Sequence, residues 1–287
     1  MKNRQEWIPL LKKRFLGRPA SPLESVEEIL PMVKGKKGLV FVLEGRGRRV
    51  VLRLHRDPLA LARIIKVYRL CRGAGVKVPA LYRFGVDPLL GMRGIVAFTV
   101  EEWLSPWEGD GREVAKILKT LHSIKRDRWG DPLWGKGGDW LEVELSKTQS
   151  RLERWSQWRG EDVGPYLAWV RDMGRRVEKV HTYSLLHGDI APSNILRKGD
   201  SPAFIDLDRA RFGHPLMDVA SLFFHFPEVG EGIFEAWGFT LSTGYFFLWL
   251  FHLRRLIRAL KHLRKGETQW ASTVEFHERW LKERAGG

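Results

Sequence analysis

The sequence predicts an α+β protein in which a small antiparallel β-sheet precedes a larger, mainly helical part. Segments with strand character are concentrated before residue 102, and long segments with helical periodicity follow it. The chain has 287 residues, which is enough for one large domain or two lobes. We therefore expect an N-terminal lobe over residues 1–102 and a C-terminal lobe over residues 103–287.

The N-terminal lobe is expected to begin with a short amphipathic helix. Apolar residues recur at near-helical spacing within residues 4–16, and Pro19 and Pro22 then end the pattern. The segments 39–43 and 50–54 are rich in Val and Leu and flank a turn that contains two glycines. This arrangement predicts a β-hairpin.

A helix and two further strands are expected to complete this lobe. The dipeptide Asp57-Pro58 is a typical helix start, and apolar residues then recur at helical spacing as far as Gly73. Residues 78–84 and 94–100 have the composition of strands.

The C-terminal lobe is predicted to be helical over residues 112–124, 140–159, 165–182 and 244–265. Tryptophans gather in its first half, and we expect them to form an aromatic core rather than a surface on which bases stack. They are Trp134, Trp140, Trp155, Trp158 and Trp169.

The last of these helices combines an apolar face with a basic stripe. The stripe consists of Arg254, Arg258, Lys261 and Lys265. A solvated outer face is the expected interpretation, and docking on an anionic membrane or polyanion is the alternative.

The net charge is high: 49 Lys+Arg against 34 Asp+Glu give +15. This charge invites anionic partners, but many charged residues with only two Asn and four Gln are also typical of a thermophile, which needs no such partner. The single Cys71 excludes an intramolecular disulfide and favours a reducing, cytoplasmic setting. Neither a membrane span nor a secretory signal is expected, because the apolar run 245–251 is too short for a bilayer.

The residues that indicate chemistry lie between 187 and 208. The run His187–Asp189 is followed by Asn194, five residues after the aspartate, and a short apolar segment then ends at Asp206. This is the order and spacing of a kinase catalytic loop and the metal-binding aspartate that follows it. The alternative is a turn at 187–189 with Asn194 as a cap, but both halves of the pattern occur in the required order.

Phosphoryl transfer explains why these residue types are needed. A carboxylate orients the attacking hydroxyl and accepts its proton, and a divalent metal bridges the phosphates. Carboxylates close to phosphate would otherwise repel it, and an asparagine supplies a hard oxygen ligand without further charge.

With Gly213-His-Pro215 and Asp218-Val-Ala220 added, the region resembles the aminoglycoside phosphotransferase and choline kinase family, which has a bilobal protein-kinase-like fold. The resemblance implies that Asp189 is the catalytic base and that Asn194 and Asp206 hold Mg²⁺. Asp208, two residues after Asp206, is a further candidate, as an outer partner of the metal. It also implies that Asp218 braces the catalytic loop.

The N-terminal lobe is similar to this family in layout. Gly35 and Gly38 occupy the place of the turn that covers the ATP phosphates. Arg53 stands where the family has a cation that pairs with the α- and β-phosphates, and Glu101 to Trp103 fit the hinge whose backbone binds adenine.

One element of the family pattern is missing. No glutamate occurs in residues 59–72, the helix that would normally supply a partner for the Arg53 cation. This absence raises the question of whether the cation is held in position for catalysis.

The function predicted from these residues is an ATP- and Mg²⁺-dependent kinase that phosphorylates a hydroxyl of a small molecule, with the nucleotide between the lobes. The acceptor is a sugar, an amino alcohol or an aminoglycoside-like compound, and the resemblance places its pocket among the C-terminal helices. No nucleic-acid partner is expected. The alternative is a nucleotide-binding pseudokinase or a basic docking protein for an anionic membrane or polyanion, which the missing glutamate and the charge of +15 would explain.

Overall fold

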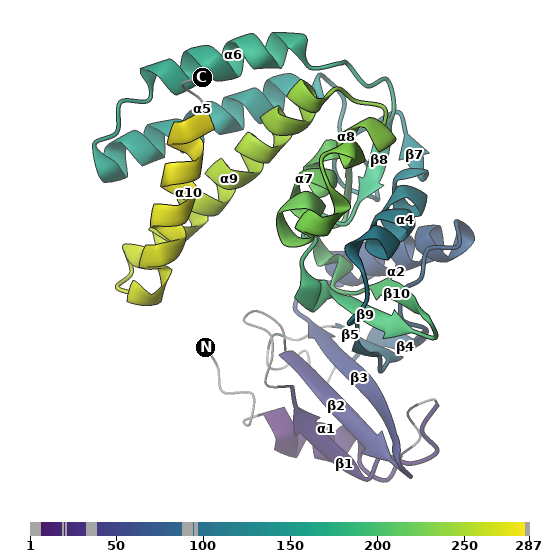
Figure 1. Ribbon diagram of the computed structural model, residues 1–287. Coiled ribbons are helices and arrows are strands. Elements are labelled where there is room, and N and C mark those ends of the chain that lie inside the picture. The colour runs from purple at the N-terminus through teal and green to yellow at the C-terminus, as the bar shows by residue number, and fades with distance from the viewer. Residues whose placement is uncertain are drawn as a thin grey trace. The chain divides into compact units, whose positions relative to one another are not determined.

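A computed structural model describes residues 7–18, 20, 22–32, 39–87, 94 and 97–284 of the chain. The chain divides into two compact units (Figure 1), Met1–Gly109 with Pro192–Ala210, and Asp110–Ala191 with Arg211–Gly287. We call them the sheet unit and the helical unit. The predicted C-terminal lobe included residues 103–109 and 192–210. In the structure both segments belong to the sheet unit, and their strands pair with each other.

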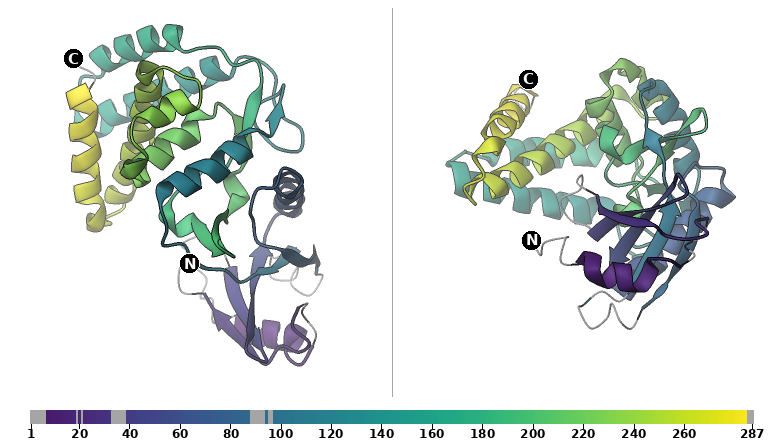
Figure 2. Two further views of the ribbon diagram at one scale, coloured as in Figure 1. Left: turned by 45° about the vertical axis from the view of Figure 1, so that its right-hand side comes forward. Right: turned by 90° about the horizontal axis from the view of Figure 1, so that it is seen from below.

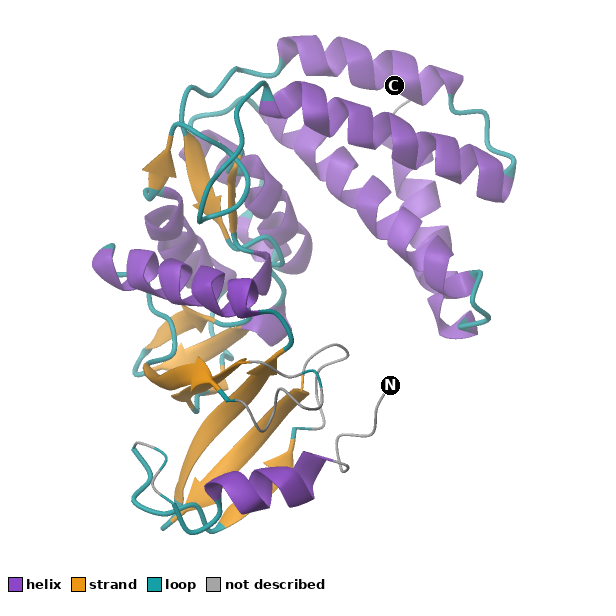
Figure 3. Ribbon diagram, turned by 180° about the vertical axis from the view of Figure 1, so that it is seen from behind, coloured by secondary structure: helices purple, strands orange, loops and turns teal. Residues whose placement is uncertain are grey.

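The sheet unit contains a five-stranded antiparallel sheet with the strand order β1-β2-β3-β5-β4. Its strands, orange in Figure 3, are β1 (Glu28–Pro31), β2 (Leu39–Gly45), β3 (Arg48–His55), β4 (Leu81–Val86) and β5 (Ala97–Glu102). The predicted hairpin is confirmed as β2 and β3. β4 begins three residues later than predicted, and β5 covers the described residues 97–100 of the other predicted strand.

Among the described residues, this unit has two helices, α1 (Ile8–Phe15) and α2 (Pro58–Gly73). The predicted start of α2 is confirmed, because the Asp57 side chain accepts a hydrogen bond of 2.9 Å from the Leu59 N–H. This bond satisfies a backbone donor that has no partner within the helix.

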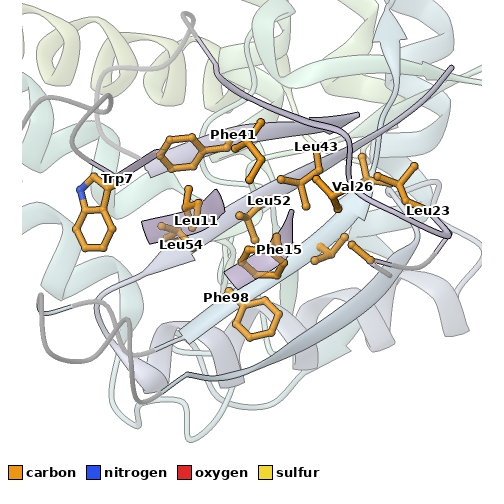
Figure 4. Packing of buried hydrophobic residues seen from close by; sticks show 14 residues of the cluster. Trp7, Leu11, Phe15, Leu23, Val26, Phe41, Leu43, Leu52, Leu54 and Phe98 are labelled. Atoms are coloured by element: carbon orange, nitrogen blue, oxygen red, sulfur yellow. The ribbon is translucent and has the colours of Figure 1, made fainter. Parts of the chain in front are cut away.

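The two faces of the sheet differ in chemistry because alternate residues of a strand point to opposite sides. On one face, Leu52, Leu54 and Phe98 pack in an apolar cluster with Leu11 and Phe15 of α1 (Figure 4). Each such buried side chain contributes about 1.5–3 kcal/mol. The apolar cluster therefore fixes which residues of β3 and β5 lie on the other face.

A second, three-stranded sheet with the order β10-β9-β6 also belongs to the sheet unit. Its strands are β6 (Ser105–Pro106), β9 (Ile195–Lys198) and β10 (Ser201–Phe204). Short 3-10 turns, η2 (Pro192–Asn194) and η3 (Leu207–Arg209), lie at its ends. Lys198 Nζ ties this sheet to the first by bonding Glu102 Oε2 at 2.6 Å and the Val78 carbonyl at 2.9 Å.

The helical unit contains seven α-helices among the described residues (Figures 1 and 2). They are α4 (Gly111–His122), α5 (Trp140–Arg159), α6 (Gly164–Arg176), α7 (Leu216–His225), α8 (Gly232–Ala236), α9 (Leu241–Leu263) and α10 (Ala271–Arg284). The unit also contains a small sheet of the order β11-β8-β7, formed by β7 (Lys125–Arg126), β8 (Tyr183–Leu186) and β11 (Arg211–Gly213), and the turns η4 (Pro227–Val229) and η5 (Thr268–Trp270).

The predicted aromatic core of this unit is confirmed. Trp155 is fully buried and stacks on Tyr166 with ring centroids 5.1 Å apart, and Trp169 lies 5.1 Å from Trp249 of α9. Trp134 differs from the prediction, because its side chain is 53% exposed.

The basic stripe predicted on α9 is wrong as a continuous exposed surface. Arg254 points inward and pairs with Glu144 of α5, with 2.8 Å between Nη2 and Oε1. Arg258 lines a pocket of the helical unit, and only Lys261 and Lys265 are exposed. The four basic residues do not form one exposed surface because α5, α7 and α10 all pack on α9 and leave this helix little surface in contact with solvent. Within the described part of the chain, no helix is long and apolar enough to cross a bilayer.

Candidate functional site

Asp189 lies in the loop after β8, and the buried carboxylate of Asp218 holds this loop in place. Asp218 Oδ2 accepts a hydrogen bond of 2.6 Å from the His187 N–H, and Oδ1 accepts one of 2.9 Å from the Gly188 N–H. Gly188 has a φ of 80°, a conformation that other residues rarely adopt. The loop therefore depends on α7, which carries Asp218, for its shape.

Asp218 remains charged in this buried position. Burial alone would raise the pKa of Asp218, but hydrogen bonding to His122 and to the loop lowers it below its usual value. His122 Nε2 lies 3.4 Å from Asp218 Oδ2, and His122 Nδ1 accepts a 2.8 Å hydrogen bond from Trp237 Nε1. Since Nδ1 accepts, Nε2 carries the proton that faces the carboxylate.

The other end of the loop is also anchored to α7. Ser221 Oγ donates a hydrogen bond of 2.8 Å to the carbonyl of Ile190. Asp189 itself is half-buried and interacts electrostatically with His225 and Arg255. Burial and the neighbouring Arg255 lower the pKa of His225 to about 4, so that this histidine is neutral near pH 7. Arg255 Nη2 lies 3.2 Å from His225 Nε2, which accepts the hydrogen bond.

Arg53 forms the centre of a second group of charged residues, in the sheet unit. Its Nη1 lies 3.1 Å from Asp206 Oδ1, and its Nε lies 3.6 Å from Glu101 Oε1. Burial would lower the pKa of Arg53, but nearby carboxylates, Glu101 most strongly, raise it above its usual value. Arg53 is therefore a permanent cation, and its side chain is only 15% exposed.

Glu101 takes the place of the missing helix glutamate as the partner of Arg53. Arg53 pairs with Thr99 across β3 and β5, so Glu101, two residues further on, lies diagonally opposite on the same face. Thr99 Oγ1 donates a 2.7 Å hydrogen bond to Glu101 Oε1. Tyr68 of α2 donates one of 3.1 Å to Glu101 Oε2. The helix thus contributes a hydroxyl that holds the carboxylate, and not a carboxylate of its own.

This role of Glu101 was missed by sequence reasoning, which assigned the residue to the adenine hinge. Glu101 is paired with Val51 of β3 on one side and with Leu81 of β4 on the other. Its side chain is buried at 3% exposure. The alternation of apolar and polar residues in β3 and β5 was the signal that could have placed Arg53 and Glu101 on one face.

The three predicted metal ligands also belong to the sheet unit. Asp206 has a φ of 59°, in the left-handed region where aspartate is tolerated better than most residues. Desolvation raises the pKa of Asp208, Arg53 opposes this, and the Asp206 carboxylate raises it further. The Asn194 carbonyl accepts a 3.0 Å hydrogen bond from the Ile205 N–H, which ties η2 to the segment before Asp206.

Two other predicted contacts are described only in part. Gly35 and Gly38 lie outside the described residues. Trp103 follows the end of β5, is 36% exposed, and has the Arg49 guanidinium 5.8 Å from its ring centroid. Its part in binding adenine stays a prediction.

Comparisons with known proteins identify the family of the chain. The model of the phosphotransferase enzyme family matches residues 31–251, more than half of the chain. The chain belongs to this family. The family predicted from the motifs is thereby confirmed, and so is the enzyme class, a small-molecule kinase.

One curated relative is a probable ketoamine kinase of Enterococcus faecium, 25% identical over 219 residues, which are 70% of this chain and 76% of the relative. A thermostable mutant of the aminoglycoside phosphotransferase APH(4)-Ia, solved with ADP and hygromycin B, has a TM-score of 0.69 at 18% identity and covers 98% and 99% of the two chains. A putative fructosamine-3-kinase from Haemophilus somnus 129PT has a TM-score of 0.59 at 13% identity, covering 89% and 92%. These structures confirm the predicted protein-kinase-like fold.

Proposed function

We propose that this phosphotransferase uses ATP and Mg²⁺ to phosphorylate a hydroxyl group of a small molecule, with Asp189 as the catalytic base. The observation that carries the proposal is the loop of Asp189, which buried Asp218 holds through two backbone N–H groups. Structures of similar fold that contain ADP or AMP-PNP together with hygromycin B support the choice of nucleotide and of a small acceptor.

The reaction forms a bond between the acceptor oxygen and the γ-phosphorus and breaks the bond from that phosphorus to the bridging oxygen of ADP. Asp189 orients the hydroxyl and takes its proton as the new bond forms. Because the loop is fixed by Asp218 and Ser221, Asp189 needs no rearrangement of its backbone to do so.

The residues of the sheet unit fit a magnesium ion bound with nucleotide. Mg²⁺ is held by one or two carboxylates together with substrate phosphates, so a large acidic cluster is not required. Among the described residues no group of three or more His, Cys, Asp or Glu gathers as a metal site. Asp206 and Asp208 interact with each other, and Asn194 adds a neutral oxygen. Bound there, Mg²⁺ would neutralise charge on the phosphates.

Arg53 would contact the α- and β-phosphates. Its planar guanidinium presents several donors, and Glu101 engages only one side of it, at Nε. The position of Arg53 therefore depends on Asp206, which binds Nη1, and on Glu101 at Nε, and through Glu101 on Tyr68.

Replacing Glu101 by glutamine is expected to raise the ATP KM about tenfold and to change the acceptor KM little. The amide oxygen can accept from one of the two hydroxyls of Thr99 and Tyr68 and the amide NH2 can donate to the other, but the charge that holds Arg53 is lost. Tyr68→Phe is expected to act in the same direction and more weakly. Steady-state kinetics with each substrate varied would measure both effects.

Glu102→Gln is the matched control, since the Glu102 carboxylate pairs with Lys198 and not with Arg53. An unchanged ATP KM in Glu101→Gln, or equal changes in both substrate KM values, would show that Glu101 does not position the phosphate-binding cation.

A pseudokinase is the competing function, and the missing helix glutamate was its main support. The contact of Glu101 with Arg53 supplies the charge that seemed to be missing. The docking alternative also loses support, because Arg254 is paired with Glu144 inside the helical unit. We therefore favour the active kinase.

ATP consumption separates the two functions. With a panel of hydroxylated acceptors, the protein is expected to convert ATP to ADP only when Mg²⁺ is present, and EDTA is expected to stop the reaction. A pseudokinase would raise its melting temperature with Mg·ATP, through preferential binding to the folded state, without consuming the nucleotide. That result over the whole panel would contradict the proposed function.

A further inference from the structure

An open pocket of about 430 Å³ lies on the helical unit, where residues of α7, α9 and α10 and of the turn η5 meet. Its chemistry is both basic and aromatic, because Arg255 and Arg258 of α9 line it together with Phe224, Trp270 and Phe276. Phe276 is 50% exposed, so its ring is open to a molecule that enters the pocket.

The positive charge of the pocket has no acidic partner within it. No Asp or Glu is among the described residues that line the pocket. Neither Arg255 nor Arg258 forms a salt bridge with a described carboxylate, whereas Arg254, their neighbour on the same helix, is paired with Glu144. Burial and then the charge of Arg258 lower the pKa of Arg255, as expected for two like charges held close together.

His277 lines the pocket and His225 contacts Arg255, and neither adds charge near pH 7. Burial lowers the pKa of His277 to about 4 and that of His225 to about 4, so both are neutral near pH 7. The only acidic group that acts on Arg255 among the described residues is Asp189. Asp189 thus opposes part of the positive charge at Arg255, and Arg258 forms no salt bridge with a carboxylate of the described residues.

The pocket adjoins the catalytic base. Arg255 lines the pocket, contacts His225 at 3.2 Å and interacts with the Asp189 carboxylate. A molecule bound to Arg255 would therefore share this residue with His225 and with the Asp189 carboxylate. Ser272 and Thr273, also in the lining, offer hydroxyls that suit a polar substrate.

We infer that this pocket binds the acceptor and that the acceptor is acidic, a hydroxylated small molecule whose carboxylate or phosphate group contacts Arg255 and Arg258 and whose flat or apolar part packs on Phe224 and Phe276. This inference rests on the proposed function for the identity of the reaction. It disfavours acceptors that carry several amino groups, because an ammonium in the pocket would face two arginines, and no described Asp or Glu lines the pocket.

The test compares acceptor probes that differ in charge. The acidic probes are D-gluconate, glucose 6-phosphate and 4-hydroxyphenyllactate, the neutral probe is sorbitol, and the cationic probes are D-glucosamine, tyrosinol and hygromycin B. Binding is measured by calorimetry without ATP, and turnover by ADP release with Mg·ATP. We expect binding and turnover among the acidic probes only, and the gluconate and glucose 6-phosphate arms distinguish a carboxylate from a phosphate.

The variant Arg258→Glu is expected to weaken binding of the acidic probes about 10- to 100-fold, the loss of a charge-assisted contact, without changing the ATP KM. Lys261→Glu is the matched control, because it makes the same change of charge on an exposed residue of the same helix. Arg258→Gln, a milder change, is expected to weaken binding without the added repulsion.

Two outcomes would overturn the inference: binding or turnover of neutral or cationic probes in preference to acidic ones, and equal effects of Arg258→Glu and Lys261→Glu. Failure of every acidic probe to bind would also overturn it. Binding that depends on Arg258 without ADP release would instead support the pocket and contradict the proposed kinase activity, so the two failures are distinguishable.

Discussion

Replacing Asp189 by asparagine is expected to lower phosphoryl transfer by about 10²- to 10⁴-fold, the usual contribution of a general base. The amide has the shape of the carboxylate but cannot take the proton of the acceptor hydroxyl. The loop should keep its form, since Asp218 holds it through the backbone of His187 and Gly188 and not through the Asp189 side chain. Single-turnover measurements with saturating Mg·ATP would report the chemical step.

The matched control is Asp200→Asn, which removes an exposed carboxylate in the turn between β9 and β10. Circular dichroism and Mg·ATP affinity should be unchanged in both variants. Turnover of Asp189→Asn close to that of the unaltered protein would remove Asp189 from the role of base.

Asp206→Asn is expected to weaken Mg²⁺-dependent ATP binding about 100-fold, because it deletes a charged metal ligand. Asparagine is the suitable substitution, since it tolerates the left-handed backbone of residue 206 and can still accept the hydrogen bond of Arg53. Calorimetry with Mg·ATP, and with ATP in EDTA, would separate the metal-dependent part of the affinity.

Asp208→Asn provides the comparison for this experiment, since Asp208 is expected to act only as an outer partner of the metal. Its effect on Mg·ATP affinity should be smaller than that of Asp206→Asn. Equal Mg·ATP affinity in Asp206→Asn and the unaltered protein would place the metal elsewhere.

The sequence predicted those parts of the site that depend on short stretches of chain. Asp189, Asn194 and Asp206 lie within 18 residues, so their order and spacing alone indicated their chemistry. Local signals also predicted the cap at Asp57, the hairpin of β2 and β3, and the helix over 140–159. The helix expected over 165–182 ends at Arg176, because Val177 is already extended.

The partner of Arg53 could not be found in this way. Glu101 is 48 residues away in the chain, and it reaches Arg53 only through the register of β3 with β5. Sequence comparison with a family pattern looked for a glutamate on the helix, where this chain has Tyr68. A carboxylate that comes from a strand and not from the helix can be recognised as the partner of Arg53 only when the pairing of the strands is known.

The pocket on the helical unit could not be predicted from the sequence for a related reason. Its lining comes from α7, α9, α10 and η5, and neither α7 nor α10 was predicted. Residues buried in α10 include His277 and Glu278 as well as Val274 and Leu281, so its apolar pattern is weak. Helical periodicity placed Arg254 and Arg258 on one face of α9, but it could not show that Glu144 neutralises only the first of them.

The sheet has one apolar face and one polar face, and this difference fixes the position of Arg53 through the contacts of its neighbours in β3. A slip of β3 by one residue would turn Arg53 toward the side covered by α1, and would turn Leu52 and Leu54 out of the apolar cluster. Losing the burial of these two leucines would cost about 1.5–3 kcal/mol each, and an arginine among apolar side chains would cost more. Arg53, the proposed phosphate-binding cation, is therefore kept in register by the apolar residues on the opposite face of its strand.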